Sequence, residues 1–166
     1  MELEEVETSD LFKRAKQNHC LTLLNLAPYK EPSKLLLDQT DILVINETEF
    51  LGLLNKAPQS VDLDFIDKNF SSLNIPSHVN VVITLGDLGV IAYANGKRKY
   101  FKSRKVQAID TVGAGDCFVG ALGFSLSENP DIFSAVKFAN CAASLSVTKK
   151  GAAKSMPSYD EVVNKL

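Results

Sequence analysis

The chain alternates stretches with helical spacing of apolar residues and short, continuous apolar runs. The runs at residues 21–24, 42–45 and 79–85 predict buried strands, the first of them ending at Asn25. Helical spacing or capping residues predict four helices between and before these strands. They are a helix capped by Thr8 or Ser9 and lasting to about Asn18, a short one from Pro32 and Ser33 to about Asp38, one over residues 47–54 closed by Pro58, and one over residues 61–73.

The second part of the chain begins with a predicted hairpin, in which residues 90–94 and 97–101 flank Asn95-Gly96. Two helices follow, one over residues 116–127 that is apolar on nearly all sides and one over residues 131–147. The apolar face of the latter contains Ile132, Ala135, Val136, Ala139, Ala143 and Val147. The pattern predicts one α/β domain over residues 1–166, with a mostly parallel sheet, helices on both faces and a late hairpin at its edge.

Composition narrows the classes of protein. Of 166 residues, 45% are hydrophobic and 23% charged, and no apolar stretch has the ~20 residues that a membrane span needs. The formal net charge is −2, and we interpret the lysines and arginines as scattered, with no basic stripe for nucleic acid. Three cysteines without a C-x-x-C pair and among apolar neighbours, together with an acidic start, predict reduced thiols in a cytoplasmic protein, with the nucleus also possible.

The loop at residues 111–115 is the strongest candidate for chemistry. Gly113 and Gly115 lead directly into a helix, where unpaired backbone N–H groups and the helix dipole favour a phosphate. Asp116 at the same helix start would repel an anion unless it acts on the reaction, and we interpret it as a general base for phosphoryl transfer to an alcohol. The alternative is that Asp116 only caps the helix and the glycines only turn the chain.

Residues 110–122, D-T-V-G-A-G-D-C-F-V-G-A-L, resemble the C-terminal signature of the ribokinase-like (PfkB) carbohydrate kinases. The resemblance implies the C-terminal half of that α/β fold and ATP-dependent phosphorylation of a sugar hydroxyl. It also implies a catalytic group that consists of Gly113, Ala114, Gly115 and Asp116, with Gly115 also at the nucleotide and Asp116 at the sugar.

Three further segments resemble family motifs in the expected order. Asn46 and Glu49 match N-x-x-E, which implies nucleotide phosphates beside Asn46 and a water-mediated Mg²⁺ at Glu49; a helix cap is the alternative. The run Thr84, Leu85, Gly86, Asp87, Leu88 and Gly89 matches a turn placed against ATP, although a plain turn would explain the glycines. Asn140 matches a position near the adenine, and backbone or solvent could satisfy it instead.

The segment at residues 147–157 resembles the closing loop of the family, which with the signature loop encloses potassium. The implied ligands are the side chains of Asp110 and Ser155 and the backbone carbonyls of Val112, Ser146, Lys149 and Gly151. Residues 25–28 resemble a turn that favours D-ribose as the substrate, and Glu4 matches a family glutamate near the sugar. For Glu4 the alternative is an exposed acidic terminus.

The matched motifs all belong to the second half of the family pattern, and we find no G-G-x-x-x-N motif for the sugar and no strands for a lid. We therefore expect very weak turnover by this half alone, because nothing orients the sugar hydroxyl. An exposed sheet edge predicts a homodimer or pairing with another chain. A non-catalytic nucleotide-binding or interaction module remains open, as does an adenosine- or fructose-type kinase of the same family.

Overall fold

The computed structural model describes residues 3–166, in which the chain divides into two compact units. Unit 1 contains Met1–Leu85 and Tyr93–Lys97, and unit 2 contains Gly86–Ala92 and Arg98–Leu166. Five strands occur in the order β1-β2-β3-β4-β5. The sheet is mixed: β1, β2 and β3 pair in parallel, and the predicted hairpin supplies the other two strands.

The strands of unit 1 are parallel and largely buried, as their continuous apolar runs predict. They are β1 (Leu23–Asn25), β2 (Ile42–Asn46) and β3 (Asn80–Thr84). In the register, Asn25 lies opposite Val44, and Asn46 lies opposite Thr84 at the carboxyl end of the next strand pair. The two polar residues that end β2 and β3 are therefore neighbours, at the end of a parallel sheet where ligands commonly bind.

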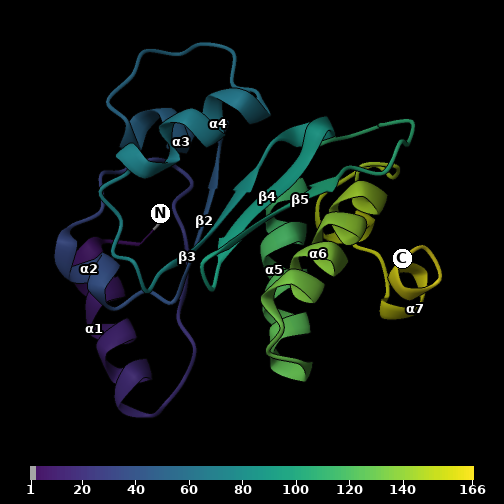
Figure 1. Ribbon diagram of the computed structural model, residues 1–166. Helices are drawn as coiled ribbons and strands as arrows, with labels where there is room; N and C mark the ends of the chain where they lie inside the picture. Colours follow the sequence, from purple (N-terminus) through teal and green to yellow (C-terminus); the bar gives the residue numbers. More distant parts are fainter. Residues whose placement is uncertain (1–2) are drawn as a thin grey trace. The chain divides into compact units, whose positions relative to one another are not determined.

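Four helices belong to unit 1: α1 (Glu5–Gln17), α2 (Lys34–Asp38), α3 (Glu47–Leu53) and α4 (Leu63–Asn69). Ser33, Asn46 and Asp62 cap the last three of these helices with side-chain hydrogen bonds. Figure 1 shows α1 and α2 in purple to blue and α3 beside α4. The caps explain why three of the four helices begin where they do.

Three predicted boundaries in unit 1 are wrong. Helix α1 begins at Glu5, and Thr8 lies inside it with its hydroxyl donating to the Glu4 carbonyl at 3.1 Å. Helix α3 ends at Leu53, because Asn55 adopts a left-handed conformation with φ 53° before Pro58 is reached. Helix α4 covers only Leu63–Asn69 and continues as a single 3₁₀ turn.

The hairpin is formed by β4 (Gly89–Ala94) and β5 (Lys97–Lys102), as predicted. Asn95 and Gly96 both have positive φ, 53° and 69°. Two consecutive residues with positive φ form the turn whose twist suits a two-residue hairpin, which is why Asn-Gly is a strong signal.

Unit 2 also contains three helices, α5 (Ala114–Glu128), α6 (Ile132–Ser146) and α7 (Tyr159–Val163), drawn in green to yellow in Figure 1. Their shared core is buried and consists of Cys117, Phe138, Cys141, Ala142 and Val162. Most of α6 is buried, whereas Ala143 and Val147 of its predicted face are only half-buried. No helix within residues 3–166 is both long and apolar enough to cross a membrane.

Candidate active site

The signature loop ends at Gly113, which is the N-cap of α5 and has a left-handed backbone with φ 79°. A Cβ at this position would lie 3.0 Å from the Cβ of Ala152 in the closing loop. Both the conformation and the close contact therefore require glycine at residue 113. Ala114, Gly115 and Asp116 are the first three helical residues, so α5 begins two residues earlier than predicted.

The first turn of α5 presents unused backbone donors. The Ala114 N–H donates to the Thr111 carbonyl at 3.2 Å, and the Cys117 N–H donates to the Gly113 carbonyl at 2.8 Å. Within residues 3–166, the N–H groups of Gly115 and Asp116 have no acceptor. Free N–H groups at the positive end of a 15-residue helix form an arrangement that binds anions.

Gly115 differs from Gly113 in what it requires. Its φ is not positive, and a Cβ built on it would meet no atom within 4 Å. Nothing in the described chain therefore needs glycine there, although glycine disfavours a helix relative to alanine by about 0.5–1 kcal/mol. The space at the Cβ position of Gly115 is therefore open within the described chain.

Asp116 is exposed, and its carboxylate makes no hydrogen bond or ion pair within residues 3–166. The alternative in which Asp116 caps α5 is wrong, because the N-cap is Gly113 and no side chain caps this helix. Asp116 also lines a groove of about 320 Å³, which is otherwise mostly apolar and includes Phe124, Phe138 and Tyr159. Its carboxylate therefore has no competing protein partner within residues 3–166.

Asp110 links the signature loop to the closing loop. Its Oδ1 accepts the Val112 N–H at 3.0 Å, and its Oδ2 accepts the Gly151 N–H at 2.9 Å. The N–H groups of Ile109 and Asp110 also donate to the Val147 carbonyl, at 2.8 and 3.2 Å. The hydrogen bond from Gly151, followed by that from Val112, lowers the pKa of the Asp110 carboxyl below its ordinary value, because both stabilise the charged form.

The remaining residues predicted to bind potassium lie in the same two loops or at the end of α6. Ser155 is 1% exposed, and its hydroxyl donates to the Ala152 carbonyl at 2.7 Å. The Ser146 carbonyl accepts the Lys149 N–H at 3.3 Å, and the Lys149 side chain pairs with Glu161 at 2.9 Å. The donor set contains only carboxylate, hydroxyl and carbonyl oxygens, which fits an alkali cation in its chemistry.

In unit 1 the predicted nucleotide residues Asn46 and Glu49 form a capping box at the start of α3. Asn46 Oδ1 accepts the N–H groups of Thr48 and Glu49 at 2.8 and 3.1 Å, and Glu49 Oε2 accepts the Asn46 N–H at 2.6 Å. Glu49 is 4% exposed. The capping alternative is thus confirmed, and it leaves Oε1 of Glu49 without a hydrogen bond in this box.

Thr84 lies beside Asn46 in the sheet register, and its hydroxyl donates to the Ile45 carbonyl at 3.4 Å. The following residues Gly86–Leu88 form a 3₁₀ turn, with φ 51° at Gly86. Gly89 has φ 117°, and a Cβ there would lie 2.1 Å from the Phe101 carbonyl oxygen. The turn itself therefore accounts for both glycines.

Asn140 is 9% exposed and binds the backbone at the end of β5, where its Nδ2 donates to the Lys102 carbonyl at 3.0 Å and the Phe101 carbonyl at 3.4 Å. The backbone is thus the partner that a polar residue inside this helix needs. The Gly89 turn packs against the same segment. The structure accordingly brings Asn140 and Gly89 together around residues 101–103.

Glu4 lies in unit 1 as the N-cap residue of α1. Its side chain is 81% exposed and lies 3.8 Å from the Lys30 ammonium, so the described contacts fit the alternative of an exposed acidic terminus. Residues 3–166 hold no cluster of three or more histidine, cysteine or acidic side chains that could bind a metal. A metal at Glu49 would therefore need ligands from a bound nucleotide or from water.

Two interpretations of the sequence need correction. Cys20 is exposed, whereas Cys117 and Cys141 are buried, so only two of the three free thiols have apolar surroundings. The basic residues are also less scattered than expected, because six of the nine residues 97–105 are lysine or arginine. Counting charges in short windows would have revealed this run, part of which lines a pocket in unit 2.

Residues 2–159 match the family model of the pfkB family carbohydrate kinases. The chain belongs to this family, and its signature loop lies at the start of α5.

Individual relatives agree with this assignment. The chain is 38% identical over 152 residues to a ribokinase of Haemophilus influenzae, which covers 92% of this chain and 49% of that protein. It is also 38% identical over 133 residues to fructokinase-1 of rice (Oryza sativa), a match that covers 76% of this chain and 39% of that protein. Among solved structures, ribokinase of Arabidopsis thaliana complexed with ribose and ATP is 28% identical to the chain, with a TM-score of 0.84. The match covers 97% of this chain and 52% of that one. The chain spans about half the length of the relatives it matches.

Proposed function

We propose that the chain is the nucleotide-binding and catalytic part of an ATP-dependent sugar kinase, as one partial domain over residues 1–166. The transferred group is the γ-phosphoryl group of ATP, and the acceptor is a sugar hydroxyl, with D-ribose giving ribose 5-phosphate. One observation carries the proposal: the Asp116 carboxylate and the N–H groups of Gly115 and Asp116 lie in the same helical turn, and none of them has a partner within residues 3–166.

Each part of this turn has a role in the transfer. The N–H groups of Gly115 and Asp116 would stabilise negative charge on the phosphoryl oxygens, and the absence of a Cβ at Gly115 allows close approach. Asp116 would accept the proton of the attacking hydroxyl, because its carboxylate has no competing partner within residues 3–166. Gly113 would hold the loop in the conformation that directs these donors outward.

The other motif residues would also serve the nucleotide. Asn46 and Thr84 would lie at its phosphates, and Gly86–Leu88 would follow its ribose. Glu49 would hold Mg²⁺ through water, with the phosphates as the main ligands. The oxygens of Asp110, Ser155 and the closing-loop carbonyls would hold K⁺, whose charge would strengthen the field at the start of α5.

The ribokinase and fructokinase relatives show the same 38% identity to the chain, so the choice of acceptor depends on other residues. The ribose preference rests on the turn at residues 25–28, where Asn25 Oδ1 accepts the Ala27 N–H at 3.5 Å. A fructose- or adenosine-type acceptor is the second candidate. Glu4 would contact the sugar in either case.

We also propose that this half pairs with another chain, either a second copy or the segment that its longer relatives contain. Strand β1 lies at one end of the strand order, and within residues 3–166 it pairs with β2 alone. Free thiols at all three cysteines suit the cytoplasm as the compartment.

Steady-state assays would test the function. A form of the protein extended to the length of its relatives should phosphorylate D-ribose with ATP, and the 166-residue chain should do so far more slowly or not at all. Fructose and adenosine serve as competing acceptors in the same coupled assay. An extended form that transfers phosphate to none of these acceptors would contradict the proposal.

A further inference from the structure

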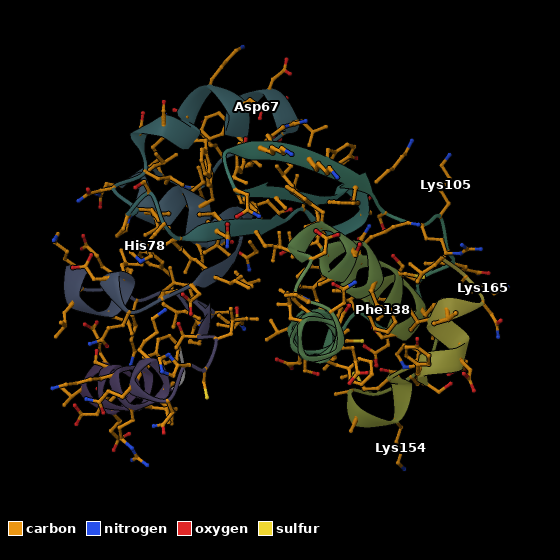
Figure 2. The ribbon with its side chains drawn as sticks, turned by 60° about the horizontal axis from the view of Figure 1, so that its bottom comes forward. Asp67, His78, Lys105, Phe138, Lys154 and Lys165 are labelled. Carbon is orange, nitrogen blue, oxygen red and sulfur yellow. The ribbon has the colours of Figure 1, made fainter. Side chains whose placement is uncertain are left out.

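A second pocket of unit 2, with a volume of about 330 Å³, carries an unusual concentration of positive charge. Its charged side chains come from three segments of the sequence: Lys102 at the end of β5 with Arg104 after it, Lys137 on α6, and Lys165 after α7. Phe101, Asn140, Cys141 and Leu166 complete the lining. In Figure 2, Lys165 and Lys105 both extend outward from unit 2, and Lys154 extends from its other end.

The four cationic side chains of the pocket have no carboxylate side chain as a partner. Within residues 3–166 none of them forms an ion pair, and the lining residues include no aspartate or glutamate. The Arg104 guanidinium donates to the Lys165 carbonyl at 2.9 Å, which holds it at the pocket wall. Four cations around one small volume repel each other unless an anion lies between them.

The charges of Arg104 and Lys137 also act on the same buried group. Burial raises the pKa of the Cys141 thiol, and the two cations act against that increase, Arg104 more strongly than Lys137. Both charges therefore lie close enough to the pocket wall to affect one atom there. Both charges would therefore attract an anion bound in the same volume.

Protection of a sheet edge does not explain this cluster. Lysines on an exposed edge strand prevent pairing with other chains, and Lys97 and Lys99 on β5 are placed for that purpose. Lys137 lies on α6 and Lys165 follows α7, so neither belongs to the edge strand. They contribute to the pocket from outside the strand.

We propose that this pocket binds a phosphorylated small molecule, with phosphate oxygens held by Lys102, Arg104, Lys137 and Lys165 and an organic part against Phe101. Because Asn140 lines the same pocket and the proposed function places the adenine beside it, the bound anion competes with ATP. The competition rests on the proposed function, whereas the anion site does not. The pocket thus gives the kinase a means of inhibition by a phosphorylated metabolite.

Amide NMR of the ¹⁵N-labelled 166-residue chain, titrated with pyrophosphate, tests the anion site. We expect saturable shifts at residues 101–104, 137–141 and 165, in addition to any at residues 113–116. Replacement of Lys102 and Lys137 by glutamine should weaken binding at the pocket at least about tenfold, because charged hydrogen bonds are lost. Neither side chain makes a hydrogen bond in the described structure, so the variant should fold.

A matched control is the double variant Lys13→Gln/Lys68→Gln, which removes the same charge from exposed positions of unit 1. It should change pocket binding less than about twofold at 0.15 M salt. Arg104→Gln is a second pocket variant and should weaken binding as well. Shifts confined to residues 113–116, or equal weakening by the control variant, would overturn the proposal.

Calorimetry of ATP–Mg²⁺ with and without saturating pyrophosphate tests the competition. The apparent affinity for ATP should fall with pyrophosphate in the original chain and change less in Lys102→Gln/Lys137→Gln. Pocket shifts with pyrophosphate but no ATP binding would remove the proposed function and leave the anion site. ATP binding without pocket shifts would overturn the anion site and leave the proposed function standing.

Discussion

The two regions that carry the family motifs differ in how far the fold itself explains their residues. At the strand ends of unit 1, Asn46 and Glu49 form a capping box, and Thr84 donates within the sheet. At the start of α5 in unit 2, Gly115 and Asp116 have no structural use within residues 3–166. A residue that the fold explains needs separate evidence of function, whereas a residue that costs stability without a structural use points to a ligand.

The largest effect should come from Asp116→Asn in a form of the protein that phosphorylates a sugar. Loss of the general base should reduce kcat by roughly 10²–10⁴-fold, because the amide cannot accept the hydroxyl proton. The free energy of unfolding should change by less than about 0.5 kcal/mol, since the side chain makes no described bond. A coupled assay and a urea titration measure the two. An unchanged kcat would contradict the role of Asp116 as general base.

The two glycines of the signature loop should respond in opposite directions to alanine. Gly113→Ala should lower the free energy of unfolding by about 1–2 kcal/mol from its left-handed backbone alone, with the Ala152 contact adding to this. Gly115→Ala should raise it by about 0.5–1 kcal/mol, because alanine favours the helix.

Calorimetry of ATP–Mg²⁺ completes this comparison. Gly115→Ala should weaken nucleotide binding although it stabilises the fold, since its Cβ would occupy the space open to a phosphate. A variant that is both more stable and equally able to bind ATP would show that the open space has no ligand.

A smaller effect is expected in unit 1. Asn46→Ala should reduce the free energy of unfolding by about 1 kcal/mol, because the N–H groups of Thr48 and Glu49 lose their acceptor. Asn46→Asp keeps that acceptor and should retain most of the stability. If Asn46→Asp instead weakens ATP binding while stability is kept, the cap also contacts the phosphates.

The smallest effect concerns pH. The folded state depresses the pKa of Asp110, so the stabilisation is complete above the unfolded pKa of about 4 and is lost as the pH falls through the folded pKa. The original chain should therefore exceed Asp110→Asn in stability near pH 7, and the difference should shrink in the acid range below pH 4. Urea titrations across that range measure it. A constant difference would mean that the charge of Asp110 is not involved.

Local signals made much of the fold predictable. Asn95-Gly96 specifies the hairpin from two residues, and Ser33, Asn46 and Asp131 cap helices through neighbours at most three residues away. The start of α1 was missed because Glu4 makes no side-chain cap, so no capping pattern marks it. Asn55 ends α3 because its backbone is left-handed. Asparagine allows this conformation, but its presence in a sequence does not predict it.

The candidate site was predictable only in part. Its residues follow a contiguous motif, and the structure places them at the start of α5 as that motif implies. The contact between Asp110 and Gly151 joins residues 41 positions apart, and no local pattern encodes such a pairing. The cationic pocket combines three separate segments, so the sequence reveals only its contribution from residues 97–105.

The bond between Asp110 and Gly151 also couples the motion of two loops. Because one carboxylate holds an amide from each loop, the signature loop cannot open independently while both bonds persist. Local unfolding of either segment would then expose both amides together, at one shared free energy. The deuterium exchange rates of Val112 and Gly151 thus act as paired reporters of how often the signature loop is released.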